Sequence, residues 1–387
     1  MTLDTSRTAP ATGTATSETA ILWQPISVAG RELPNRLVVA PMSRVSTHGD
    51  GVPTEQMAEY YRQFSLGGFG LTITEGTYPL GPASQGYTNQ PGLTTPAQAA
   101  GWATVTSAVH AVGGLIVAQL MHAGALSQHL AATLGPSAIT PRGQQMPEYG
   151  GTGPYPTPAA ATEAEIEDII AGFAASAALA ADAGFDGVEI HAANGYLLDQ
   201  FLTPHLNTRA GRYGGTAAAR AQLTADVAAA VRSSTRGRIL IGVRLSQAKV
   251  NDSHHKWLDK PEATDIFATI AHAGPDYLHL AGEGRPWTDS GHAADGTPLG
   301  ALARELTDLP VIVNGGLHAP ELIERVLDSG EADLVSLATA ALADPDWPTR
   351  IRSGQKPRPF DPGMITPAAT VQNTHDFLHP PGGAPRS

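Results

Sequence analysis

The residues best suited to chemistry in this chain lie close together in the stretch HAANGYLLDQF, at positions 191–201. The stretch directly follows the apolar run FDGVEI, so His191, Asn194 and Tyr196 lie where a buried strand should give way to a helix. His and Tyr side chains can hold or transfer a proton, and the Asn amide can donate a hydrogen bond. Each residue alone is more often a packing or solvated group. Together, at one junction, they predict a catalytic site.

The elements that must position these residues recur as short apolar runs, each followed by a helical pattern. Helical patterns stand at 54–65, 95–114, 162–184 and 319–330, and several of them open with Thr as an N-cap. Most of the runs are apolar on both faces, as a parallel sheet covered by helices requires. The runs lie at 35–41, 69–76, 115–124, 185–194, 239–246, 276–282, 309–316 and 332–338. Eight strand-then-helix units in one α/β chain predict a (β/α)₈ TIM barrel.

Two features of the connections refine this prediction. A doubly wound sheet is the structural alternative, but MSRVSTHGDG after the first strand lacks the G-x-G-x-x-G phosphate loop. The segment 125–161, after the third strand, is too long and too rich in Pro and Gly for an ordinary connection. Loops after barrel strands lie at the face that carries the active site, so we expect this insertion to form part of its wall.

Composition limits the classes of partner and compartment. The 387 residues carry a net charge of −12, with 42% hydrophobic and 16% charged residues and no Cys. Disulfides, thiolate nucleophiles and cysteine-ligated iron–sulfur clusters are thereby excluded. We expect a cytoplasmic protein that acts on a small molecule, without nucleic acid or membrane as partner, and a homo-oligomer stays open. The expected domains are an N-terminal tail at 1–20, a barrel at 21–365 and a C-terminal tail at 366–387.

The polar groups at the expected strand ends suit a planar cofactor with a phosphate tail. No carboxylate pair, nucleophile elbow or metal-ligand cluster stands out among them. Gln119 offers a donor and an acceptor to an imide edge, and Arg244 can lie where negative charge accumulates. The pair Gly315–Gly316 leaves room for a phosphate to approach backbone N–H groups.

From about Leu22 to Pro359 the chain resembles the Old Yellow Enzyme family of flavin mononucleotide (FMN)-dependent ene reductases. The motifs that carry this resemblance are NRLVVAPMSR, ITEGTYP, GYTNQPG, QLMHAG, EIHAANGYLLDQFLTPHLNTRAGRYGG, VRLS and LADPDW. The resemblance implies a barrel that binds FMN and uses NAD(P)H to reduce an activated C=C bond of an enone-type substrate.

The resemblance also implies a role for each matching residue. His191 and Asn194 should hold the carbonyl oxygen of the substrate, Tyr196 should donate the proton, and Tyr87 is similar to a tyrosine of the substrate pocket. Gly315 and Gly316 should approach the flavin phosphate. The residues expected around the flavin ring are Pro41, Met42, Ser43, Gly76, Gln119 and Arg244.

The chemistry of the reaction agrees with these roles. Hydride added to the β-carbon of an enone places negative charge on the carbonyl oxygen, where two fixed donors are most effective. A Tyr hydroxyl, with an ordinary pKa near 10, is a suitable acid for the enolate carbon. We therefore expect His191 and Asn194 to be a pair of hydrogen-bond donors and Tyr196 to be the acid.

One departure from the family concerns the flavin phosphate. The family has Gly-Arg at the end of the eighth strand, where the Arg binds the phosphate, and this chain has Ala338-Thr339. Losing a charged donor there costs about 1.5–3 kcal/mol of binding free energy. The departure keeps two alternatives open: an isomerase or cyclase of a biosynthetic intermediate on the same barrel, or a cofactor-free barrel that binds a small ligand.

Overall fold

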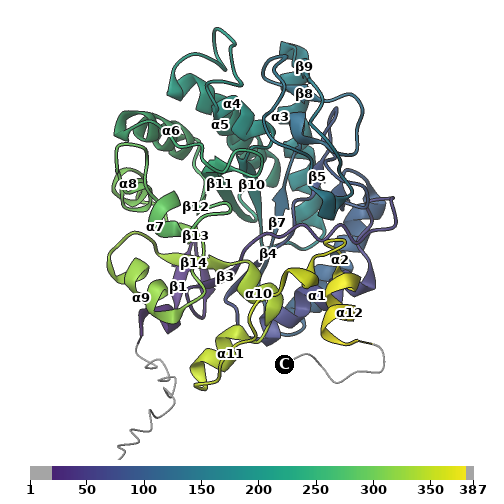
Figure 1. Cartoon of the computed structure of the whole chain (residues 1–387), viewed down its shortest axis with the longest axis vertical. Helices are drawn as coiled ribbons and strands as arrows, with labels where there is room; N and C mark the ends of the chain where they lie inside the picture. Colours follow the sequence, from purple (N-terminus) through teal and green to yellow (C-terminus); the bar gives the residue numbers. More distant parts are fainter. Residues whose placement is uncertain (1–19, 381–387) are drawn as a thin grey trace, which may run out of the picture.

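The computed structural model describes residues 20–380, and at its centre eight parallel strands form a closed barrel (Figure 1). Each strand overlaps one of the apolar runs, which confirms the predicted (β/α)₈ TIM barrel. In order around the barrel the strands are β3 (Leu37–Val39), β4 (Leu71–Ile73), β7 (Ile116–Leu120), β10 (Gly187–Asn194), β11 (Leu240–Lys249), β12 (Tyr277–Ala281), β13 (Val311–Asn314) and β14 (Leu334–Leu337), and β14 pairs with β3.

The helices follow the strands along the chain and surround the barrel (Figure 1). Thr54, Thr95 and Thr162 cap α1, α2 and α3 by accepting a hydrogen bond from the third residue beyond, as the sequence predicts. The bounds are α1 (Glu55–Leu66), α2 (Pro96–His110), α3 (Glu163–Asp182), α4 (Leu197–Leu202), α5 (Ala217–Thr235), α6 (Lys260–His272), α7 (Trp287–Ser290), α8 (Leu299–Thr307), α9 (Pro320–Asp328), α10 (Thr339–Ala343), α11 (Trp347–Arg352) and α12 (Val371–Leu378). Among the described residues, no helix is long and apolar enough to cross a membrane.

The two ends of the barrel differ in polarity. At the N-terminal end of the strands, the hairpin of β1 (Ile26–Val28) and β2 (Arg31–Leu33) places Val28 and Leu33 in an apolar cluster with strand residues such as Leu71 and Ile312. At the other end the buried strand residues are polar, among them Gln119 and Arg244. The polar side chains that a ligand would need are therefore gathered at the C-terminal end of the barrel.

The insertion after β7 folds over this polar end. It contains the 3₁₀ helices η2 (Gly124–Leu126) and η3 (Pro147–Tyr149), and the short parallel strands β8 (Leu134–Gly135) and β9 (Ala159–Ala160). A second short pair, β5 (Tyr78–Pro79) and β6 (Gly92–Leu93), follows β4. Tyr149 of η3 lines the central cavity, so the insertion contributes to the wall of the site as expected.

The C-terminal segment is more structured than the sequence suggests. Residues 366–380, expected as part of a tail, include α12, which packs beside α1 (Figure 1). Arg44 donates to the Thr370 carbonyl oxygen at 2.5 Å, and Val371 N–H donates to Ser46 Oγ at 2.9 Å. The segment thus holds the loop after β3 in place. The tail expected at 1–20, apart from Ala20, and residues 381–387 lie outside the described residues.

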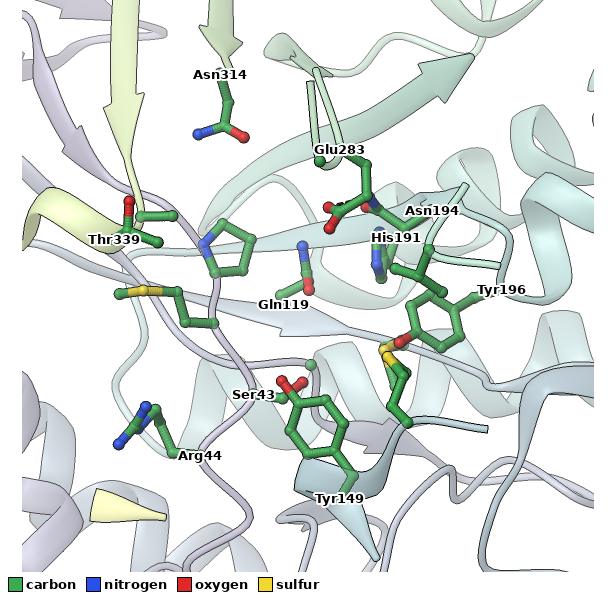
Figure 2. A pocket seen from close by; sticks show the side chains of 18 of the residues that line it. Ser43, Arg44, Gln119, Tyr149, His191, Asn194, Tyr196, Glu283, Asn314 and Thr339 are labelled. Carbon is green, nitrogen blue, oxygen red and sulfur yellow. Dashed lines mark hydrogen bonds between the residues drawn. The ribbon is translucent and has the colours of Figure 1, made fainter. Parts of the chain in front are cut away.

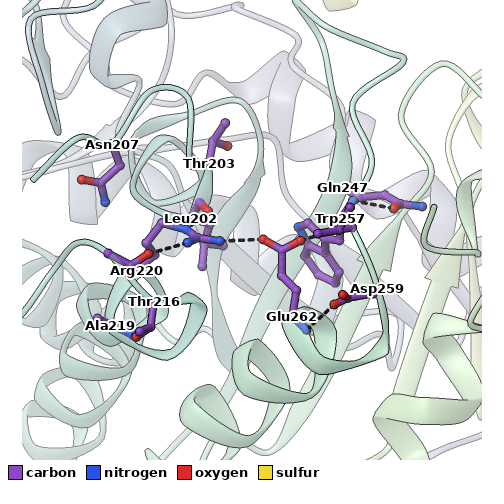
Figure 3. Close-up of polar contacts among 12 residues, drawn as sticks. Leu202, Thr203, Asn207, Thr216, Ala219, Arg220, Gln247, Trp257, Asp259 and Glu262 are labelled. Atoms are coloured by element: carbon purple, nitrogen blue, oxygen red, sulfur yellow. Dashed lines mark hydrogen bonds and ion pairs between the residues drawn. The ribbon is translucent and has the colours of Figure 1, made fainter. Parts of the chain in front are cut away.

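A buried arginine on α5 connects the end of α4, the helix that follows Tyr196, to α6 (Figure 3). Arg220 on α5 donates to the carbonyl oxygens of Leu202 and Gly215, each at 2.7 Å. Its remaining nitrogen lies 2.5 Å from Glu262 on α6, and the two side chains are only 8% and 15% exposed. Because α4 begins directly after Tyr196, this contact fixes the far end of the element that orients that tyrosine.

We predict that Arg220→Met lowers the free energy of unfolding by about 3 kcal/mol, because it removes the cation that pairs with Glu262 and the donor to two carbonyl oxygens. The matched control is Arg238→Met, which breaks the pair of Arg238 with Asp182 at 3.3 Å, where both side chains are more than half exposed. That change should alter stability by less than about 0.5 kcal/mol. Urea unfolding followed by circular dichroism measures both, and equal losses would contradict the prediction.

Candidate active site

A cavity of about 460 Å³ lies at the C-terminal end of the barrel, within the usual size range of ligand pockets. Figure 2 shows Asn314 and Thr339 on one side of it, His191, Asn194 and Tyr196 on the other, and Gln119 between them. Of the residues predicted from the sequence, those that line the cavity are Pro41, Met42, Ser43, Gly76, Gln119, His191, Asn194, Tyr196, Arg244, Ala338 and Thr339.

Beneath the cavity a buried network holds the two side chains expected to face the flavin ring. Glu189 accepts from Gln119 Nε2 at 2.8 Å and lies 2.8 Å from His279 Nδ1. Arg244 NH1 lies 3.0 Å from His279 Nε2, while the buried Arg244 Nε has no partner. Burial acts to raise the pKa of Glu189, but His279, Arg244 and Gln119 together lower it. The network therefore keeps an anion next to the guanidinium and fixes the Gln119 amide.

The loop after β3, which carries Pro41, Met42 and Ser43, is fixed by a buried carboxylate. Glu75 accepts from the backbone N–H groups of Arg44 and Val45, each at 2.8 Å, and from the Tyr61 hydroxyl at 3.2 Å. Burial raises the pKa of Glu75 to about 7, against the pull of these donors. The loop is held in one conformation, including the positive φ of 37° at Val45.

The stretch from His191 to Tyr196, which the sequence predicts to be catalytic, turns sharply between β10 and α4. Asn194 has a φ of 62°, a left-handed conformation that Asn tolerates, and Gly195 has a φ of 90°. The Gly195 N–H donates to Asp199 Oδ2 at 2.6 Å, and Asp199 Oδ1 lies 2.5 Å from Lys249 Nζ. Both charged side chains are at least 97% buried. This ion pair therefore anchors the turn that places Asn194 and Tyr196 at the cavity.

The protonation states of the stretch follow from burial. Burial and the nearby Arg244 guanidinium lower the pKa of His191 to about 3, so the ring is neutral at neutral pH and carries one N–H. Burial raises the pKa of Tyr196 well above its ordinary value, so the hydroxyl keeps its proton. The two rings lie 5.2 Å apart between centroids. Neutral His191 and protonated Tyr196 are both donors toward the cavity.

Three predicted residues lie outside the cavity wall. Tyr87 is fully buried behind Tyr196, and the two hydroxyl groups are hydrogen-bonded to each other. Gly315 accepts a hydrogen bond from Trp287 N–H at 2.8 Å, and a Cβ at Gly315 would lie 3.0 Å from that nitrogen. The loop after β12 thus covers the Gly315–Gly316 turn, and neither glycine lines the cavity.

Other residues that line the cavity were missed by sequence reasoning. Lys249 was missed because β11 runs three residues beyond the predicted apolar run. Glu283 follows the end of β12, so the rule that active-site groups stand at strand ends would have found it. Tyr149 lies in the insertion, whose sequence has no periodic pattern that fixes its side chains.

The residues present fit a flavin ring better than they fit its phosphate. The orphaned Nε of Arg244 and the free acceptor of Gln119 suit the polar edge of a planar ring. At Gly76 a Cβ would lie 2.6 Å from Met121 Sδ, so a larger residue there would displace the Met121 side chain. On the opposite side Asn314 and Thr339 offer neutral polar groups where a phosphate needs donors.

A parallel (β/α)₈ barrel with these groups at its C-terminal mouth defines a flavin-dependent oxidoreductase. Residues 21–357 match the model of the NADH:flavin oxidoreductase / NADH oxidase family. The chain belongs to this family, which is the Old Yellow Enzyme family, and it is an FMN-dependent NAD(P)H oxidoreductase of the ene reductase type.

Individual relatives cover nearly the whole chain. Chanoclavine-I aldehyde reductase of Penicillium roqueforti is 35% identical over 347 residues, which cover 88% of this chain and 91% of the relative. A probable flavin mononucleotide-dependent alkene reductase of Leishmania infantum is 31% identical and covers 92% and 98%. The structure of the old yellow enzyme homologue from Zymomonas mobilis superposes with a TM-score of 0.79 at 30% identity, covering 91% of this chain and 99% of that one.

The buried pair beneath the catalytic turn gives a prediction about stability. Lys249→Met leaves Asp199 buried without its cation, which should cost about 3–5 kcal/mol of unfolding free energy. The double variant Asp199→Asn/Lys249→Met removes both charges and should be more stable than Lys249→Met alone. Chemical unfolding of the wild type, both single variants and the double variant measures the coupling. Purely additive losses would show that the two charges do not stabilise each other.

The neutral phosphate side gives a prediction about cofactor affinity. Thr339→Arg should tighten FMN binding by about 10- to 100-fold, because it adds a charged donor where Thr339 offers only a hydroxyl group. Thr339→Met is the matched control, of similar length but uncharged, and it should not tighten binding. Titration of the apoprotein with FMN, followed by quenching of flavin fluorescence, gives both dissociation constants. Equal values would mean that the phosphate is bound elsewhere.

Proposed function

We propose that His191, Asn194 and Tyr196 form the substrate site of this ene reductase, with an α,β-unsaturated carbonyl compound as substrate. The observation that supports this most is that the neutral His191 ring and the Asn194 amide lie beside the protonated Tyr196 on the same side of the cavity (Figure 2). When bound, FMN supplies the hydride that it receives from NAD(P)H. The residues of the chain then have to bind the carbonyl group, stabilise charge on its oxygen and provide a proton.

The donors act on the carbonyl oxygen. His191 donates from one ring nitrogen because its lowered pKa keeps the ring neutral, and Asn194 donates from its amide. Asn194 is set before any substrate arrives: its N–H donates to Ser246 Oγ at 2.7 Å, and the pair of Asp199 with Lys249 holds the turn. Donors fixed in advance stabilise the developing enolate without a cost of reorganisation.

Tyr196 provides the proton for the α-carbon. Its raised pKa keeps the proton on the oxygen until a strong base is presented, and an enolate carbon is such a base. Tyr87 contributes from behind, because its buried hydroxyl is bonded to that of Tyr196 and orients it. We assign Tyr87 this positioning role in place of a contact with substrate, since it does not line the cavity.

The role of Tyr196 is tested by changing the acceptor. Tyr196→Phe should slow NAD(P)H oxidation with 2-cyclohexenone as acceptor by roughly 10²- to 10⁴-fold, the usual contribution of a positioned general acid. With molecular oxygen as acceptor the rate should stay near that of the wild type, because no carbon is protonated. Stopped-flow absorbance of the two reactions measures both rates.

The matched control is Tyr155→Phe. The Tyr155 hydroxyl is bonded to Gln128 Oε1 at 3.4 Å and does not line the cavity, so this change should leave both rates unaltered. Equal cyclohexenone rates in Tyr196→Phe and the wild type would remove Tyr196 from the mechanism.

A further inference from the structure

We propose that Glu283 determines specificity, and that its carboxylate selects unsaturated carbonyl substrates that carry a protonated amine close to the carbonyl group. This inference rests on the proposed function, because it assigns the substrate class of the same site. The established family and activity do not require an acidic group at this position.

The geometry places the carboxylate beside the expected oxygen site. Glu283 lies in the loop that follows β12, lines the cavity, and points into it next to Asn194 and His191 (Figure 2). Its Oε2 accepts from Asn194 Nδ2 at 2.6 Å. In the described part of the chain its Oε1 has no hydrogen-bond partner, and the residue forms no ion pair. One oxygen is therefore held by the protein, and the other is free for a ligand.

Among the described residues, the charge of Glu283 is compensated only in part. Arg244 is the cation that attracts it, but Arg244 also faces Glu189 and is bonded to His279. Lys249 lines the same cavity but is paired with Asp199. Burial raises the pKa of Glu283, with Arg244 opposing this, and a cation from the ligand would hold the carboxylate ionised.

The negative charge of Glu283 affects the pKa values of other residues that line the cavity. Its charge contributes to the raised pKa values of Tyr149 and Tyr196, which lie on different segments of the cavity wall. An ionised carboxylate here opposes the negative charge that develops on the enolate of a neutral substrate. An ammonium group on the substrate reverses this effect, because it pairs with the free Oε1 and offsets the charge.

The position of Asn194 limits how far the ammonium group of the substrate can lie from its carbonyl oxygen. Its amide has two N–H bonds, of which one is used by Glu283 and the other remains for the substrate oxygen. The ammonium group and the carbonyl oxygen must then lie on either side of one amide. The structure thus favours substrates in which a few bonds separate the amine from the unsaturated carbonyl system.

Binding of two phenols to the holoenzyme tests this. A phenolate oxygen on a planar ring resembles the enolate oxygen, so the probes are 2-(aminomethyl)-4-ethylphenol, which carries an ammonium group next to the oxygen at neutral pH, and 4-ethylphenol, which has no charged group. Isothermal calorimetry should show that the wild type prefers the ammonium probe by about 10- to 100-fold, the range of a charge-assisted hydrogen bond. Glu283→Gln should lose this preference and bind 4-ethylphenol at least as tightly as the wild type does.

A second acidic residue of the cavity wall provides the control. Glu148→Gln removes one negative charge from the lining without touching the Asn194 contact, and it should keep the preference for the ammonium probe. In addition, kcat/KM for neutral 2-cyclohexenone should rise in Glu283→Gln, a gain that a misfolded variant cannot produce.

Several outcomes overturn the proposal. They are no preference in the wild type, a preference that survives in Glu283→Gln, or equal losses in Glu283→Gln and Glu148→Gln. A separate variant, His191→Ala, tests the proposed function itself. If that change leaves the affinity for 4-ethylphenol unaltered, the oxygen is bound elsewhere, whatever the ammonium comparison gives.

Discussion

The barrel depends on how buried charges are matched at its C-terminal end. Closing eight parallel strands brings their polar ends into one enclosed region, where an unpaired charge is costly. Where the flavin ring is expected, Glu189 balances the charge of Arg244 and accepts a hydrogen bond from Gln119 at 2.8 Å. Asp199 and Lys249 meet the same constraint at the catalytic turn. The Gln119 amide and the turn that carries Asn194 are thus held by buried charged side chains.

The same constraint explains why the protonation states of the catalytic residues are suited to their proposed roles. His191 lies near the Arg244 guanidinium in a buried place, so it stays neutral and can only donate through one nitrogen. Burial raises the pKa of Tyr196, so it retains its proton although the hydrogen bond with Tyr87 acts in the opposite direction. In the described part of the chain His191 Nδ1 has no hydrogen-bond partner, whereas the Tyr196 hydroxyl is bonded to that of Tyr87. The cavity is polar where charge develops and carries no proton acceptor stronger than the enolate itself.

Much of this could be predicted from the sequence, for a physical reason. Strands buried on both faces are apolar throughout, so all eight appear as short runs, and the groups at their ends fall at one mouth. What could not be predicted depends on packing between distant segments. The loop of Trp287 covers Gly315, β11 extends to bring Lys249 to the cavity, and α12 forms where Arg44 can bond to Thr370. No local pattern encodes such contacts.

The two sides of the cavity carry different polar groups from the middle, where Gln119 and Arg244 are expected to face the flavin ring. Thr339 offers the cavity a neutral hydroxyl group, while the carboxylate of Glu283, which forms no ion pair among the described residues, stands beside the proposed oxygen site. Neither residue adds a cation to the cavity, in a chain whose net charge is −12. A more negative cavity weakens attraction for an anionic phosphate and strengthens it for a cationic substrate. The rigid barrel keeps the two sides apart, so each can change without moving Gln119 and Arg244 between them.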